Sequence, residues 1–166
     1  MTWSRSISSF ILVLFAVGFL AGCAGSGAAQ QGTMRERIGV ASPEDVVEGT
    51  RHVLITEHGY RYDREVATTE DMRFITQWME HTPEGDEQAA GTTGCRTRVL
   101  VNARPKDRSS GTVRTYTVIF RAEYQVQREG AATWMDAPIP ESREAYFDDI
   151  VDQLESEMTM GIRSYR

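Results

Sequence analysis

Apolar and polar residues alternate most regularly along residues 113–127, which predicts a strand with one buried face. Weaker alternation predicts three further strands, at 60–66, 72–79 and 95–103. The connections before and after the third of these are rich in turn-forming residues, so we expect antiparallel hairpins. The side chains expected to point into the core are Tyr60, Tyr62, Val66, Met72, Phe74, Thr76, Trp78, Cys95, Thr97, Val99, Val101, Ala103, Tyr116, Val118, Phe120, Ala122, Tyr124 and Val126.

Two other segments repeat their apolar residues at the period of an α-helix. The first begins at Ser42, a good N-cap, is followed by Pro43 in the first helical position, and ends at Gly59. The second covers residues 141–160. The apolar stripes are Val46, Val47, Thr50, Val53 and Leu54 in the first helix, and Phe147, Ile150, Val151, Leu154 and Met158 in the second.

This order of elements predicts a single α+β domain over residues 42–166. A two-layer arrangement buries both helical stripes, so we expect a roughly four-stranded antiparallel sheet with an N-terminal and a C-terminal helix packed on one face. A chain of 166 residues is long enough for one modest core.

The first 23 residues follow a different pattern. Arg5 precedes an apolar run over residues 10–20, which is shorter than the roughly 20 residues of a membrane-spanning helix and is typical of a secretion signal. The sequence Leu-Ala-Gly-Cys follows at residues 20–23. This order of charge, apolar run, small residues and cysteine resembles the lipobox of bacterial lipoproteins, in which the cysteine thiol receives a diacylglycerol group.

The resemblance implies that residues 1–22 are a signal peptide and that Cys23 carries the lipid anchor. Because Ala24 rather than an aspartate follows the cysteine, it also implies transport to the outer membrane, with the domain facing the periplasm. Residues 23–41 are rich in small and polar residues, and we expect a flexible tether there. With Cys23 modified, Cys95 has no partner for an intramolecular disulfide, so it is either a small buried hydrophobe or a thiol open to another chain.

Charge narrows the range of partners. The chain has 24 acidic and 18 basic residues, a formal net charge of −6. A negative protein gains nothing electrostatically from a phosphate backbone, so we expect no nucleic-acid partner.

No combination of residues in the sequence indicates catalysis, a cofactor or a metal ion. There is no phosphate-binding loop, dinucleotide fingerprint or nucleophile elbow. His81 with Glu80 and Glu84 has the residue types of a metal site in a loop, but solvated surface positions are the favoured interpretation. Asp148 and Asp152 share the polar face of the last helix, where a solvated acidic surface is favoured over paired catalytic carboxylates. We therefore expect a protein that is not an enzyme.

The sheet face that points away from the helices is the best candidate for a binding surface. Arginines alternate there with isolated apolar residues, a combination that is favoured in protein contacts, although an ordinary solvated sheet face is the alternative. Trp134, after the last long strand, is a second candidate, unless it covers the end of the core. The residues expected to bind a partner are Ile75, Met79, Arg96, Arg98, Leu100, Ile119 and Trp134, and Arg73 and Arg121 lie on the same face.

The order of elements over residues 42–160 is similar to that of small two-layer lipoproteins of bacterial envelope assembly, such as the lipopolysaccharide-assembly lipoprotein and the helix-grip lipoprotein of the β-barrel assembly machinery. This resemblance implies a domain that binds a partner protein or an amphiphile and performs no chemistry. Our leading hypothesis is an anchored lipoprotein that binds another envelope protein. The second is a carrier or sensor of a small amphiphilic or cell-wall-derived ligand, held between helices and sheet by the aromatic residues Phe74, Trp78, Tyr116, Phe120 and Tyr124.

Overall fold

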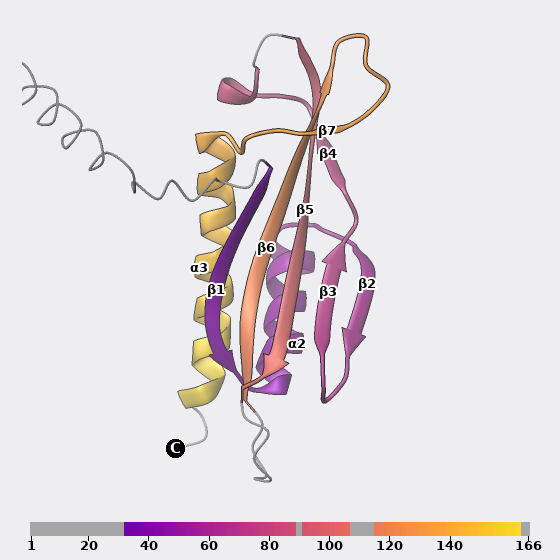
Figure 1. The fold of residues 1–166 in the computed structure, drawn as a ribbon. Coiled ribbons are helices and arrows are strands. Elements are labelled where there is room, and N and C mark those ends of the chain that lie inside the picture. The colour runs from indigo at the N-terminus through magenta and orange to yellow at the C-terminus, as the bar shows by residue number, and fades with distance from the viewer. Residues whose placement is uncertain (1–31, 89–90, 107–114, 164–166) are drawn as a thin grey trace, which may run out of the picture.

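The computed structural model describes residues 32–88, 91–106 and 115–163, so the predicted signal peptide and Cys23 lie outside the described residues. The strands are β1 (Thr33–Ala41), β2 (Tyr62–Ala67), β3 (Met72–Thr76), β4 (Met79–His81), β5 (Thr92–Pro105), β6 (Tyr116–Arg128) and β7 (Met135–Asp136) (Figure 1). The helices are α2 (Pro43–Arg51), which continues as a π-helical segment over His52–Glu57, and α3 (Glu141–Arg163). A short 3-10 turn covers Gly85–Glu87.

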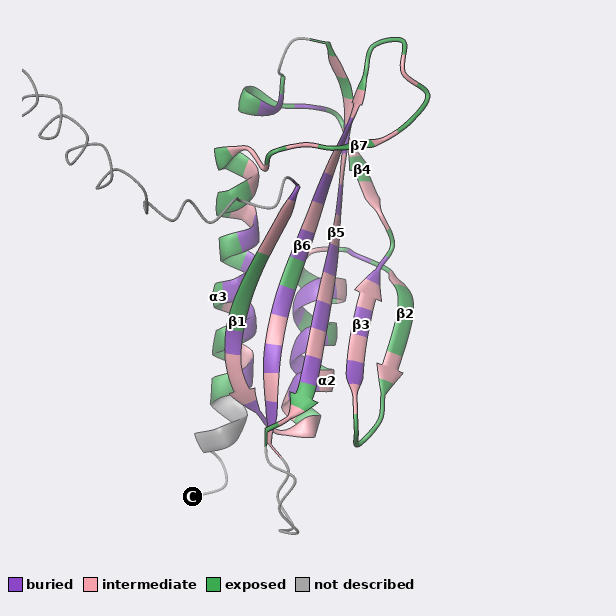
Figure 2. Cartoon of the chain, viewed as in Figure 1, coloured by how far each residue is buried: buried purple, intermediate pink, exposed green. Residues whose placement is uncertain are grey.

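All of these strands belong to one antiparallel sheet. The order across the sheet is β1-β6-β5-β3-β2, with β4 beside β5 and β7 beside β6. Helices α2 and α3 lie on one face (Figures 1 and 2), and we call the other face, which no described helix covers, the open face. The α+β class and the antiparallel sheet with two helices are confirmed, whereas the predicted size of roughly four strands is wrong, because the sheet has seven.

Strand β1 is one of the additional strands. The sequence predicts a flexible tether over 23–41, but Thr33–Ala41 pairs with β6, so the folded domain does not begin at residue 42. The apolar–polar alternation that would predict this strand is weak, because residues 35–37 are charged and exposed at the edge of the sheet. A register shift between Arg37 and Gly39 allows Ile38 to reach the core, where only 7% of it is exposed.

The core lies between the sheet and the two helices, as the alternation and the helical period predict. The inward side chains of β5 and β6 and the stripes of both helices form one cluster. Its most deeply buried members are Ala41, Val46, Val53, Leu54, Phe74, Val99, Val101, Ala103, Tyr116, Val118, Phe120, Ala122, Phe147, Ile150 and Leu154. A smaller cluster of Cys95, Tyr124 and Val126 extends this core toward β7. Removal of this apolar surface from water is the main stabilising contribution to the fold.

The helix boundaries follow the predicted capping residues. The Ser42 Oγ accepts a hydrogen bond from the backbone N–H of Asp45 at 3.1 Å, which satisfies a free donor in the first turn. Gly59 has a φ of +70°, a conformation that costs glycine little, and the chain turns there toward β2. None of the helices within the described ranges is long and apolar enough to cross a lipid bilayer.

An extra residue between β3 and β4 reverses the direction of the side chains that follow. Ile75 pairs with Leu100 and Met79 pairs with Thr97, so four residue steps along this segment match three along β5. The inserted residue acts as a β-bulge. Met79 consequently packs against the core instead of lying on the open face, and Trp78 contacts arginines of the open face instead of the core. The predicted directions of both side chains are therefore wrong.

Candidate functional site on the open face of the sheet

Arginine side chains dominate the open face. Because side chains alternate along a strand, paired positions on neighbouring strands share a face, and five strands contribute arginines to this one. They are Arg35, Arg37, Arg64, Arg73, Arg96, Arg98, Arg104 and Arg121. The carboxylates at paired positions of the same face are those of Glu80, Glu123 and Asp136. The open face is therefore positive, although the net charge of the chain is −6.

A hollow of about 630 Å³ lies in this face and extends over β1, β6, β5 and β3. We call it the arginine hollow. Its apolar side chains are Ile75, Leu100, Pro105 and Ile119, all half-buried. Its cations are Arg35, Arg73, Arg104, Lys106 and Arg121, all exposed except the half-buried Arg73. No carboxylate belongs to the described residues that line it.

Some of these cations are paired within the protein and others are not. The Arg121 Nη2 lies 3.0 Å from Glu123 Oε1, and the Arg73 Nη2 lies 3.3 Å from Asp71 Oδ2. The side chains of Arg35, Arg104 and Lys106 form no hydrogen bond or ion pair with another described residue. Within the described residues, no carboxylate therefore competes with an external anion for these three side chains.

Glu123 illustrates how this face holds a carboxylate. Its Oε2 accepts a hydrogen bond from Arg98 Nε at 2.7 Å and lies 2.5 Å from Arg98 Nη2, while its Oε1 contacts Arg121 on its own strand. Only 14% of the Glu123 side chain is exposed. Charge-assisted contacts of this kind with the planar guanidinium group are stronger than neutral hydrogen bonds.

At the other end of the face, the guanidinium group of Arg96 lies between two tryptophans. Its central carbon is 4.4 Å from the centre of the Trp78 ring and 4.5 Å from that of the Trp134 ring. Gln125 Oε1 accepts hydrogen bonds from two nitrogens of Arg96, at 2.9 and 2.6 Å. Burial lowers the pKa of Arg96, whereas the nearby Glu80 acts in the opposite direction. The polar and aromatic groups at this end are thus already partnered, in contrast to the arginine hollow.

Most of the predicted partner-binding residues lie on this face, but in two separate groups. Ile75, Leu100 and Ile119 lie in the arginine hollow, whereas Arg96, Arg98 and Trp134 belong to the stacked group near Trp78. Met79 is excluded by the bulge described above.

The sequence interpretation missed the unpaired cations of the hollow. Arg35 lies in a segment predicted to be a tether, and Arg104 and Lys106 lie in a predicted turn. The alternation of apolar and polar residues correctly places Arg73 and Arg121 on the open face. Part of the hollow can therefore be predicted from this alternation.

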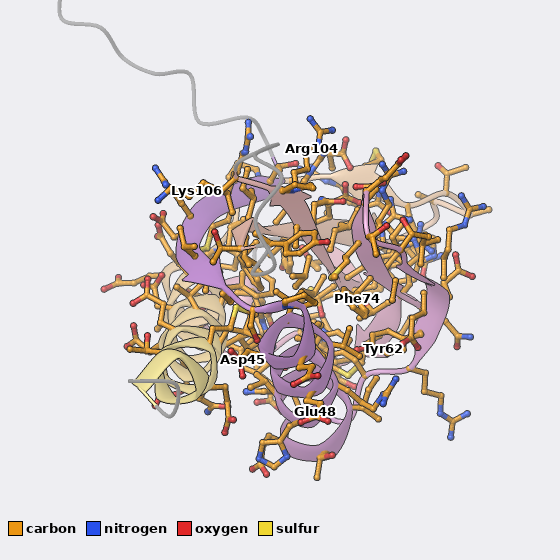
Figure 3. The ribbon with its side chains drawn as sticks, turned by 90° about the horizontal axis from the view of Figure 1, so that it is seen from below. Asp45, Glu48, Tyr62, Phe74, Arg104 and Lys106 are labelled. Carbon is orange, nitrogen blue, oxygen red and sulfur yellow. The ribbon has the colours of Figure 1, made fainter. Side chains whose placement is uncertain are left out.

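The helical layer carries the opposite charge. The exposed acidic residues of α3 are Glu141, Glu144, Asp148, Asp149, Asp152 and Glu155, which confirms the predicted solvated acidic surface. Viewed along the strands, Arg104 and Lys106 lie on one side of the sheet, and Asp45 and Glu48 of α2 lie on the other (Figure 3). The molecule is therefore electrostatically two-sided, and an approaching charged partner is oriented by this difference.

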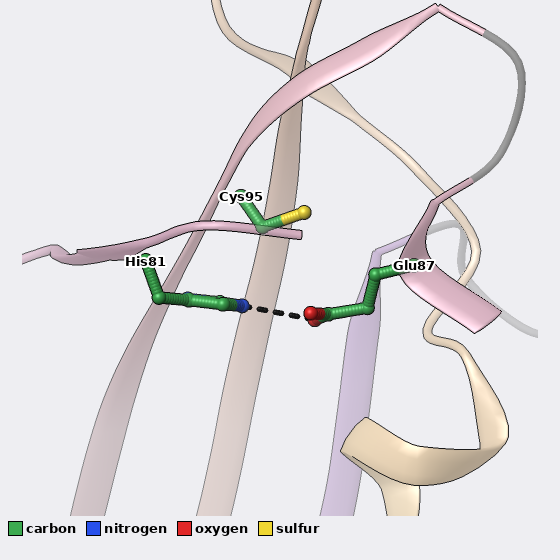
Figure 4. Close-up of side chains that lie close together, drawn as sticks. All are labelled: His81, Glu87 and Cys95. Carbon is green, nitrogen blue, oxygen red and sulfur yellow. Dashed lines mark hydrogen bonds and ion pairs between the residues drawn. The ribbon is translucent and has the colours of Figure 1, made fainter. Parts of the chain in front are cut away.

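A second group of reactive side chains lies below the surface near β4. His81, Glu87 and Cys95 place their ligand-type atoms within 4.8 Å of one another (Figure 4). His81 Nε2 donates to Glu87 Oε1 at 2.9 Å, so His81 is not the solvated surface residue that the sequence suggested. Arg143 Nε donates to the same oxygen at 3.0 Å and ties the start of α3 to this group.

Of the two interpretations of Cys95 that the sequence allows, a buried hydrophobe or a thiol open to another chain, the structure supports the first. Cys95 is fully buried and unpaired, and its Sγ lies 3.1 Å from the Tyr124 hydroxyl. Burial raises the pKa of the Cys95 thiol, with the Tyr124 hydrogen bond acting against it. A protonated and inaccessible thiol is a poor nucleophile.

These three residue types suit a zinc ion chemically, but their present contacts favour a structural role. Both carboxylate oxygens of Glu87 are occupied, because Oε2 accepts the backbone N–H of Glu84 at 3.2 Å while Oε1 accepts from two side chains. The positive guanidinium group of Arg143 also opposes a cation at this position. The group therefore acts as a buried ionic clamp between β4, the 3-10 turn and α3.

No protein-family model matches this chain, and no curated protein matches its sequence.

Proposed function

We propose that this chain is a membrane-anchored, non-enzymatic lipoprotein of the bacterial cell envelope, and that its domain binds another envelope protein through the open face of the sheet. The lipid on Cys23 would hold it at the outer membrane, facing the periplasm. Its role would be that of an accessory in assembly, transport or structure.

The observation that carries this proposal is the arginine hollow. Apolar side chains and arginines occur together there, and these are the residue types enriched at the centres of protein interfaces. The absence of any described helix over this face leaves it available, whereas the opposite face is used by the core. The lipobox supplies the second element of the proposal, an anchor in the membrane.

The non-enzymatic part of the proposal is supported by the state of the reactive side chains. Catalysis needs a nucleophile or an acid–base group that reaches substrate. Cys95 and Glu87 are buried, and the carboxylate of Glu87 is fully engaged in the clamp.

The test is co-purification of crosslinked complexes from cells that express the full chain. Replacing Arg98 and Leu100 together by glutamate places negative charge in the middle of the open face, and we expect it to abolish recovery of the partner. The matched control is Arg128→Glu with Ser156→Glu, which changes the net charge equally at exposed positions outside the hollow. A wild-type chain that recovers no specific protein, or a double substitution of Arg98 and Leu100 that has no effect on recovery, would contradict the proposal.

The alternative function, a carrier of a small amphiphile, has less support. Its aromatic residues Phe74, Tyr116 and Phe120 are fully buried within one packed cluster, and Trp78 lies on the other side of the sheet. Ligand sites are usually preformed spaces of several hundred Å³. Phe74 and Phe120 are packed within the interior, whereas Tyr116 borders an open pocket of about 490 Å³ beside α2 that no second described aromatic residue lines.

A further inference from the structure

We infer that the arginine hollow binds a carboxylate-rich segment of the partner protein, with Arg35, Arg104 and Lys106 pairing with its acidic side chains. This inference rests on the proposed function, because it assumes that a partner protein docks on the open face. It adds the chemistry by which that partner is recognised.

The first argument is charge complementarity. Like charges repel one another, and of the five cations that line the hollow only Arg73 and Arg121 form an ion pair with a described carboxylate. Three of these cations have no side-chain partner among the described residues, so an incoming carboxylate would displace no described side chain from them. A cationic partner segment would meet the same repulsion and is disfavoured.

The open face already holds one carboxylate in the way that we infer for the partner. Glu123 inserts its carboxylate between Arg98 of β5 and Arg121 of β6, at the border of the hollow. Arg35 and Arg104 lie on the same face, on the strands to either side of β6, and neither has an equivalent acid among the described residues. A glutamate or aspartate from outside would complete the pattern that Glu123 begins.

The relative exposure of apolar and charged side chains in the hollow favours a protein segment over a lipid surface as its ligand. A surface that inserts into the acyl region of a membrane needs apolar side chains that project beyond the charged ones. In the hollow the order is reversed, because Ile75, Leu100 and Ile119 are half-buried while Arg35 and Arg104 are exposed. An apolar side chain flanked by acidic ones, as in a peptide segment, fits this arrangement of an apolar floor below cations.

The negative charge of the helical layer helps to orient the partner segment toward the open face. An acidic segment is repelled by the exposed carboxylates of α3 and attracted by the open face. Screening reduces such forces beyond about 8 Å at physiological ionic strength, so this orienting effect acts when the partner is close to the domain.

The experiment places a photo-crosslinking amino acid at Ile119 in the full chain and illuminates living cells. We expect a protein adduct whose crosslinked peptide is rich in aspartate and glutamate. Charge reversal by Arg104→Glu with Lys106→Glu should lower the adduct yield at least about tenfold, because two attractions become repulsions. The matched control is Arg61→Glu with Arg128→Glu, which makes the same change in net charge at exposed positions outside the hollow and should leave the yield within about twofold.

The outcomes distinguish this inference from the proposed function. A protein adduct that persists after charge reversal, or whose peptide has no excess of acidic residues, overturns the inference and leaves the proposed function standing. An adduct with phospholipid or lipopolysaccharide shows that a membrane surface occupies the hollow and also overturns the inference. If no protein is crosslinked from this or any other position of the open face, the proposed function itself fails.

Discussion

Replacement of Glu87 by glutamine tests the buried clamp that ties β4 to α3. The carboxylate accepts hydrogen bonds from His81 Nε2 at 2.9 Å and from Arg143 Nε at 3.0 Å on one oxygen, and from the Glu84 backbone on the other. A glutamine side chain has one oxygen and one amide nitrogen. Whichever way it is turned, its N–H2 group faces at least one other donor, and the positive charge of Arg143 loses its counter-charge.

The size of the stability loss depends on how deeply Glu87 and Arg143 are buried. Removing one member of a buried ion pair costs about 3–5 kcal/mol. Only 1% of the Glu87 side chain is exposed, but 19% of Arg143 is, so water solvates part of the charge that remains. We therefore expect a loss near the lower limit, about 3 kcal/mol in the free energy of unfolding, equivalent to a fall of roughly 10 °C in Tm for a domain of this size.

The loss in the free energy of unfolding caused by Glu87→Gln depends on pH. Burial alone would raise the pKa of Glu87, but the hydrogen bonds from His81 and Arg143 outweigh it, and the pKa lies below its ordinary value. A carboxyl group with a lowered pKa stabilises the fold above its unfolded pKa of about 4.3, and this stabilisation is lost as the pH falls through the folded pKa. The difference between wild type and variant should be full at neutral pH and should shrink in acid.

Urea unfolding followed by circular dichroism at about pH 7 and about pH 3.5 measures both quantities. Glu155→Gln is the matched control, because it makes the same chemical change at an exposed position of α3 and should alter stability by no more than about 0.5 kcal/mol. The clamp is refuted if Glu87→Gln is as stable as this control at neutral pH, or if its deficit is the same at both pH values.

We expect three other outcomes, two of them from the structure and the third from the lipobox. Arg96→Ala removes a guanidinium group stacked between Trp78 and Trp134 and should cost about 1–2 kcal/mol and shift tryptophan emission to longer wavelength; unchanged emission would contradict the stack. Zinc in excess over the protein should leave Tm unchanged, because Glu87 is already saturated, and a rise in Tm would reveal a metal site at the clamp. Cys23→Ala should release the protein from membranes, and an equally membrane-bound variant would exclude the lipid anchor.

The core was predictable from the sequence because each of its elements obeys one period. The alternation of β6 and the stripe of α3 are regular, and their expected inward residues, such as Phe120 and Ile150, are fully buried. Ser42 and Gly59 also act where expected, since capping and positive φ are local properties of single residues.

The errors arise where pairing between distant segments decides the outcome. Strand β1 is polar in its middle and becomes a strand only because β6 supplies a partner edge. Register shifts also break the alternation, after Thr76 and near Tyr62, and the second one places Val66 opposite Arg73 on the open face instead of in the core. The arginine hollow depends on the pairing of β1, which supplies Arg35, so the sequence revealed the apolar residues of the hollow but not all of its cations.

The central claim is that the open face, and not the helical face, meets the partner protein. Its most direct test compares photo-crosslinking amino acids at Leu100 and at Asp152 in otherwise wild-type full-length chains in living cells. Leu100 lies in the arginine hollow, and Asp152 is exposed on the acidic surface of α3. We predict a specific protein adduct from Leu100 and none from Asp152; equal adducts from both positions, or an adduct from Asp152 alone, would contradict the account.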